Sequence, residues 1–127
     1  MRISLVLAAS LFAATAAVAE EDAEAKIRGQ AYAQCYGVYH AMQTLAEKQH
    51  DDSTAASFKE RAAKADALAR DAYKVNGLTD DDMDSELDAS AEAIESQFQP
   101  LSGGDGWYDL NAMKKETQSC DAMLQGE

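Results

Sequence analysis

Residues 29–46 carry no charged side chain, in a chain of 127 residues that has 23 acidic and 11 basic ones. They read GQAYAQCYGVYHAMQTLA. Apolar residues recur through this stretch at steps of three or four, which is typical of a helix with one buried face and does not fit the alternation of a strand. The apolar positions are Ile27, Ala31, Cys35, Val38, Met42 and Leu45. We therefore expect a core-facing helix with Cys35 at its centre.

A ridge of small residues, Gly29, Ala33, Gly37 and Ala41, follows the side of this helix away from Cys35. Glycine inside a helix costs about 1 kcal/mol relative to alanine, so two glycines on one ridge need a reason. One interpretation is a solvated back face that tolerates them. The other is a second packing surface that meets a long loop, a partner protein or a second copy of the chain. The 29–41 ridge is thus a possible partner-binding face and homodimer interface.

The first 19 residues have the pattern of a cleaved signal peptide. Arg2 supplies the positive charge, residues 3–18 are apolar, and residues 17–19 read Ala-Val-Ala, a small-residue cleavage site. Cleavage after Ala19 leaves 108 residues, with ten basic and all 23 acidic side chains and a net charge of −13. We expect residues 20–127 to form one domain, exported to the periplasm or secreted. Residues 29–46 contain too many polar side chains to span a bilayer.

Turn signals divide the domain into four helices. The first is expected to begin near residues 21–24 and to end near residues 49–50, where Asp51, Asp52 and Ser53 offer N-caps for a second helix up to Val75. Asn76-Gly77 is a helix stop, and Thr79 is the expected cap of a third helix that ends before Pro100. The fourth helix is expected from about residue 107 to residue 124. Each of the last three helices has one expected buried line: Phe58, Ala62, Ala65, Leu68, Ala69, Ala72 and Val75 in the second, Met83, Leu87, Ala91, Ile94 and Phe98 in the third, and Leu110, Met113, Thr117, Cys120 and Leu124 in the fourth.

The two cysteines of an exported chain favour a disulfide. Cys35 lies about 21 Å before the end of the first helix, and Cys120 about 18 Å after the start of the fourth, at 1.5 Å per residue. In antiparallel neighbours they would meet at one level of the core. We therefore predict an all-α, up-down four-helix bundle with a Cys35–Cys120 disulfide. Free thiols serving as metal or redox ligands are the alternative, but there is no CxxC spacing.

The distribution of charged residues along the chain suggests which kind of partner the protein could bind. Residues 76–112 contain ten acidic side chains and no basic one. Asp80, Asp81, Asp82 and Asp84 could lie against the basic second helix, could simply be solvated, or could recruit a cationic partner. Such a surface argues against nucleic acid or an anionic membrane as the partner.

An aromatic pair, Trp107 and Tyr108, follows the glycine-rich segment 102–106. Such side chains are common at the centres of protein interfaces, so this pair is a further candidate partner-binding site. The competing interpretation is that Trp107 caps the core at the start of the fourth helix.

Motifs for metals and catalysis are incomplete. Asp80-x-Asp82-x-Asp84 resembles the opening of a calcium loop, but Ser85 and Ala91 stand where that loop needs glycine and glutamate. His40 and His50 show no metal-ligand spacing, and no catalytic fingerprint is present. The sequence thus favours a protein-interaction module without enzymatic activity, cofactor or metal. The alternative is a small-ligand, metal or haem carrier within the bundle.

Overall fold

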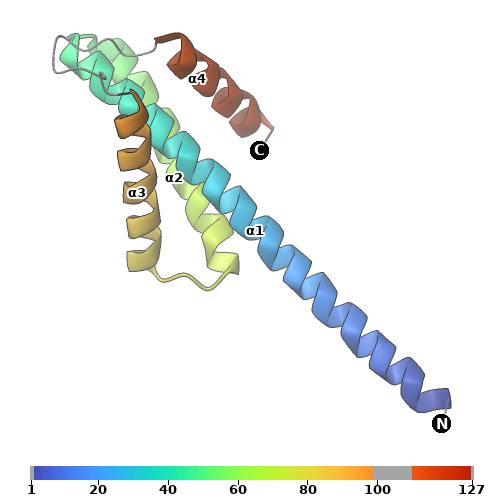
Figure 1. The fold of residues 1–127 in the computed structure, drawn as a ribbon. Helices are drawn as coiled ribbons and strands as arrows, with labels where there is room; N and C mark the ends of the chain where they lie inside the picture. The colour runs from blue at the N-terminus through green and yellow to red at the C-terminus, as the bar shows by residue number, and fades with distance from the viewer. Residues whose placement is uncertain (1, 99–109, 127) are drawn as a thin grey trace.

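The chain is all-α, with one central helix. The computed structural model describes residues 2–98 and 110–126, with side chains from 22 to 97 and from 113 to 126. These residues form four helices and no strand. The helices are α1 (Arg2–Lys48), α2 (Asp52–Val75), α3 (Asp80–Phe98) and α4 (Leu110–Gln125), shown in Figure 1. The predicted all-α class and the four predicted helices are confirmed for these residues.

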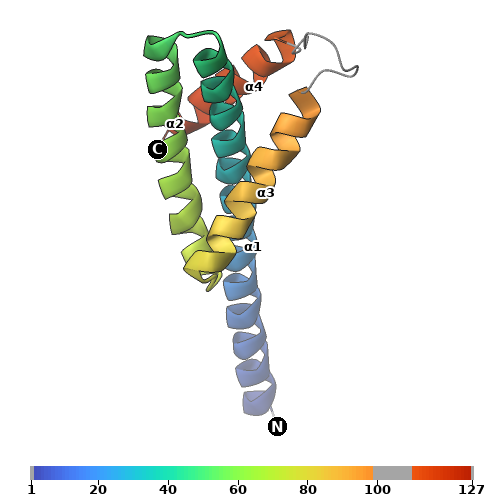
Figure 2. The ribbon, with the colours of Figure 1, turned by 90° about the vertical axis from the view of Figure 1, so that its left-hand side faces the viewer.

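Successive helices alternate in direction around α1. Helix α2 runs antiparallel beside α1, while α3 and α4 lie on opposite sides of it (Figures 1 and 2). Helix α1 packs against each of the other three, most extensively against α2. The first part of α1 projects beyond the other helices (Figure 1). It continues unbroken to Arg2, instead of beginning near residues 21–24, because residues 3–19 are rich in strong helix formers such as alanine and leucine.

Two similar turns end α1 and α2. His50 has a φ of 57° and Gly77 a φ of 73°, both in the left-handed region. In each turn an amide bonds the carbonyl five residues back: Asp51 to Ala46 at 2.9 Å, and Leu78 to Tyr73 at 3.4 Å. This is the hydrogen-bond pattern of a Schellman motif. The predicted stop at Asn76-Gly77 is confirmed, and His50 has a structural role as the residue that ends α1.

Side-chain caps begin α2 and α3 where the sequence predicts them. The Asp51 carboxylate accepts a hydrogen bond from the Thr54 amide at 3.2 Å. Thr79 Oγ1 accepts one from the Asp82 amide at 3.2 Å, and Asp82 accepts one in return from the Thr79 amide at 3.4 Å. This reciprocal pair is a capping box in which aspartate takes the place of the usual glutamate.

The 29–41 ridge is buried inside the chain. Gly29, Ala33, Gly37 and Ala41 are all buried. A Cβ at residue 29 would lie 2.7 Å from the Tyr73 ring of α2, and one at residue 37 would lie 2.8 Å from the Ser90 carbonyl oxygen of α3. The solvated interpretation is therefore wrong. The ridge is a packing surface, but its neighbours are α2 and α3, and a second copy cannot reach it while they cover it.

Alanines let α2 approach α1 closely. The buried residues of α2 are Ala55, Phe58, Ala62, Ala65, Ala69, Ala72 and Tyr73. Two predicted core residues are exposed instead, Ile27 by 65% and Val75 by 56%. Near Ile27, the buried residues of α1 are Ala25 and Gly29. Ile27 lies about 200° around the helix from both. The apolar repeat therefore placed Ile27 on the wrong face.

The predicted Cys35–Cys120 disulfide is present, with the two Cα atoms 5.5 Å apart. It joins α1 to α4, whose buried residues are those predicted: Met113, Thr117, Cys120 and Leu124. Helix α3 likewise buries the expected Met83, Leu87, Ala91 and Ile94. The side chains of Phe98 and Leu110 lie outside the described residues.

Candidate functional site

The acidic residues singled out by sequence have separate local surroundings. Asp80 and Asp81 are exposed, and Asp82 takes part in the cap of α3. The Asp84 carboxylate accepts a hydrogen bond from Arg70 of α2, which also pairs with Asp66. Part of the acidic helix is therefore neutralised by α2, as one of the sequence interpretations supposed.

The side chains described in the structure contain no group of three or more histidine, cysteine or acidic residues placed to hold a metal ion. His40 lies beside α3, with Nδ1 3.5 Å from Glu95 Oε1. Trp107 and Tyr108 lie outside the described residues. The described helices also include none that is both long and apolar enough to cross a membrane.

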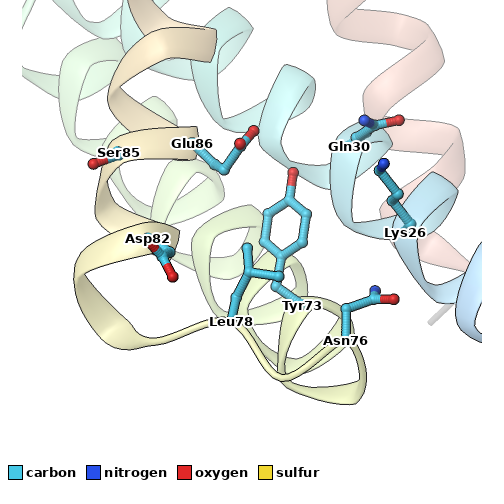
Figure 3. Close-up of a pocket in the computed structure, with 8 residues that line it drawn as sticks. All are labelled: Lys26, Gln30, Tyr73, Asn76, Leu78, Asp82, Ser85 and Glu86. Atoms are coloured by element: carbon cyan, nitrogen blue, oxygen red, sulfur yellow. The ribbon is translucent and has the colours of Figure 1, made fainter.

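A cleft of about 480 Å³ lies where α1, the α2–α3 turn and α3 meet. Figure 3 shows its lining: Lys26, Gln30, Tyr73, Asn76, Leu78, Asp82, Ser85 and Glu86. This volume is within the range of small-molecule sites in proteins, about 300–1,000 Å³. Every one of these residues follows the expected signal peptide, so cleavage after Ala19 would leave the cleft intact.

Tyr73 lies at the centre of this site. Its side chain is only 3% exposed, yet among the described residues its hydroxyl has no hydrogen-bond partner. The hydroxyl points into the space between Glu86 of α3 and the α1 side chains Lys26 and Gln30 (Figure 3). Burial, together with the negative charge of Glu86, raises the pKa of Tyr73 above the ordinary value for a phenol. The hydroxyl is therefore protonated at neutral pH and can both donate and accept.

Gly29 and Asn76 fix the position of the tyrosine. The Tyr73 ring lies so close to Gly29 that a Cβ there would be 2.7 Å from it. With its amide orientation assigned from hydrogen bonding, Asn76 places its nitrogen 3.0 Å from the Asp22 carbonyl oxygen and its oxygen 3.2 Å from the Lys26 amide. The turn after α2 is thus held against the α1 backbone beside the cleft.

A second tyrosine provides a contrast. The Tyr39 hydroxyl, at the other end of the bundle, donates to Asp121 Oδ1 at 2.7 Å. Arg61 approaches the same carboxylate at 3.3 Å, and Lys64 donates to the Leu124 carbonyl at 3.1 Å. These contacts join α1 and α2 to α4. Tyr39 therefore has a structural partner of the kind that Tyr73 lacks.

The apolar pattern of the sequence did not predict this site. It placed Ala72 and Val75, but not Tyr73, on the buried line of α2. The usable signal was the 29–41 ridge, because a glycine at residue 29 indicates a close neighbour. It could not reveal that this neighbour is an aromatic ring with a free hydroxyl.

Comparison of the chain with known protein families, with curated proteins and with solved structures finds no match.

Proposed function

We propose that this chain is an exported binding protein, not an enzyme, and that the cleft around Tyr73 holds a small polar ligand. The observation that carries the proposal is the buried Tyr73 hydroxyl, which has no partner among the described residues. Of the functions considered from sequence, this one corresponds to the small-ligand carrier.

The Tyr73 hydroxyl, unpaired among the described residues, costs free energy in the ligand-free protein. A buried polar group without a hydrogen bond costs about 1–3 kcal/mol. Phenylalanine would fill nearly the same space without this cost. A ligand that pairs with the hydroxyl would offset the cost when it binds, which gives the tyrosine a reason to be there.

Export is supported by the signal-like residues 1–19 and by the disulfide, since disulfides persist mainly in oxidising compartments. In the projecting part of α1, the first side chain described as buried is Ala25, after the expected cleavage site. We propose the periplasm as the compartment, with secretion as the alternative.

The test is the native mass of the mature protein isolated under non-denaturing conditions, compared with that of a Gln30→Trp variant. Gln30 lines the cleft, and tryptophan should fill part of it. We expect a bound small molecule on the wild-type protein and its loss from the variant.

Gln34→Trp is the matched control, because Gln34 is exposed one turn further along α1. It should keep the bound mass. The proposal would be contradicted by an apo mass for the wild-type protein, or by equal bound mass on Gln30→Trp.

A protein partner is the second candidate, because α3 contains eight acidic residues and no basic one. Asp81, Asp88 and Glu92 are exposed at helical spacing, on the side opposite the buried Met83 and Ile94. We propose that this stripe could recruit a cationic protein, with an affinity that falls as salt rises.

Neutralising Asp81, Asp88 and Glu92 together should abolish co-purification of such a partner at low salt. Neutralising Glu60, Asp71 and Glu116, which are exposed on α2 and α4, removes the same charge elsewhere and should not. The stripe would be excluded as the binding face if both triple variants lost the partner equally, or if both retained it equally.

A further inference from the structure

The cleft has opposite charges on its two sides. Glu86 and Asp82 belong to α3, whereas Lys26 and Gln30 belong to α1. In Figure 3 the Tyr73 hydroxyl lies between Glu86 on one side and Lys26 with Gln30 on the other. The α3 side therefore offers hydrogen-bond acceptors and negative charge. The α1 side offers an ammonium group and a side-chain amide.

These charges are not paired with each other. Lys26 forms no salt bridge with Glu86 or Asp82, and all three side chains are exposed. In contrast, Arg70 of α2 and Asp84 of α3 form a direct ion pair. The cleft thus keeps both carboxylates and an ammonium group available to a ligand.

The Tyr73 hydroxyl could form a hydrogen bond with either a positively or a negatively charged group of a ligand. Its oxygen can accept a hydrogen bond from an ammonium group held by Glu86. Its proton can be donated to a carboxylate held by Lys26 and the Gln30 amide. Charge-assisted hydrogen bonds of this kind are about twice as strong as neutral ones.

We propose that the cleft binds a small zwitterion carrying both an ammonium and a carboxylate group, namely a free α-amino acid or a short peptide. This inference rests on the proposed function, because it names the ligand class of the same cleft. The volume of about 480 Å³ leaves room for such a molecule. A ligand with one charge would form a charged contact with only one of Lys26 and Glu86, and should therefore bind more weakly.

Isothermal titration of the mature protein tests this inference. The probes are the individual amino acids, di- and tripeptides, and the N-acetyl and amide derivatives of the best amino acid. We expect one zwitterion to bind, and each capped derivative to bind about tenfold more weakly because it loses one charged contact. Preference for the amino acid or for the peptide identifies the source of the zwitterion.

Single substitutions then assign the contacts. Glu86→Gln, Lys26→Met and Tyr73→Phe should each weaken the zwitterion about tenfold or more. The N-acetyl derivative has no ammonium group, so Glu86→Gln should not weaken its binding further. The amide derivative has no carboxylate, so Lys26→Met should not weaken its binding further. Glu92→Gln and Lys59→Met, which alter exposed residues outside the cleft lining, are the controls and should leave affinity unchanged.

Two results would overturn the inference: no zwitterion in the panel binds, or the capped derivatives bind as well as the parent. These outcomes are separable from failure of the proposed function. A wild-type protein that carries another bound small molecule, lost in Gln30→Trp, would keep the binding site and reject only the zwitterion.

Discussion

At the scale of single residues, glycine in α1 sets how closely its neighbours approach. Gly37 is buried, and a Cβ there would lie 2.8 Å from the Ser90 carbonyl oxygen, a backbone atom that α3 cannot move without shifting as a whole. The four-residue spacing of the ridge predicted a close contact. It could not predict the neighbour, because spacing along one helix contains no information about which other helix packs on it.

Gly37→Ala should destabilise the protein by about 1–2 kcal/mol, because overpacking outweighs the gain in helix propensity of about 1 kcal/mol. Urea unfolding measures the change. Gly126→Ala is the control, since its Cβ would lie an ordinary 3.6 Å from the nearest atom. A Gly37→Ala protein as stable as the wild type would show that α3 does not press on this ridge.

We predict that the stability of the protein depends on pH through the ionisation of Tyr39. Burial, the hydrogen bond to Asp121 and the charge of Asp121 raise the pKa of Tyr39 in the folded protein well above the phenol value of 10.0. Its contribution to stability is therefore complete below about pH 10 and is lost as the pH rises through the folded pKa. Urea midpoints measured at increasing pH should fall more steeply for the wild type than for Tyr39→Phe. Parallel slopes would contradict this account.

At the scale of helices, local signals in the sequence predicted the ends of elements well. Asp51 and Thr79 cap α2 and α3, and Gly77 ends α2, because these residue types satisfy backbone groups within one turn. The buried faces of α3 and α4 were also predictable, since each has one apolar stripe. The faces of α1 were less predictable, because three helices surround it and its polar and small residues also become buried.

The disulfide should matter most to α4. It closes a separation of 85 residues, which corresponds to about 4–5 kcal/mol of chain entropy. Without it, α4 keeps the burial of Met113, Thr117 and Leu124. It also keeps the contacts of Tyr39 and Arg61 with Asp121 and of Lys64 with Leu124.

In a Cys35→Ala/Cys120→Ala variant, hydrogen exchange should therefore accelerate first in α4, while α2 stays protected. The wild-type protein under the same conditions is the control. Equal acceleration in α2 and α4 would mean that the disulfide stabilises the bundle as a whole and does not specifically hold α4.

At the scale of the whole molecule, the period of the apolar residues, the turn signals and the positions of the two cysteines predicted an all-α protein with one disulfide. The structure confirms both for the residues that it describes. The cleft was not predictable, because it is assembled from residues 26 and 30, 73–78 and 82–86, which come together only when three helices pack. Tyr73 in particular falls next to the predicted apolar line of α2. Only the packed structure shows that its hydroxyl is buried without a partner.

At this scale we also predict that the signal peptide is cleaved after Ala19. The exported protein should begin at Glu20, as measured by N-terminal sequencing and intact mass. Ala19→Phe should block cleavage because the site requires small residues, whereas Ala16→Phe should permit it. An exported wild-type chain that still begins at Met1 would contradict the signal-peptide assignment.

The central claim is that the Tyr73 hydroxyl serves a ligand and not the fold. Its most direct test is the free energy of unfolding of ligand-free Tyr73→Phe, with Tyr39→Phe as the comparison. Tyr39→Phe should lose about 1.5–3 kcal/mol, because it removes a hydrogen bond to a charged group. Tyr73→Phe should be as stable as the wild type, or more stable by up to about 1–3 kcal/mol, because it removes an unpaired buried hydroxyl. A loss in Tyr73→Phe as large as that in Tyr39→Phe would show that the hydroxyl has a structural partner, and would contradict the account.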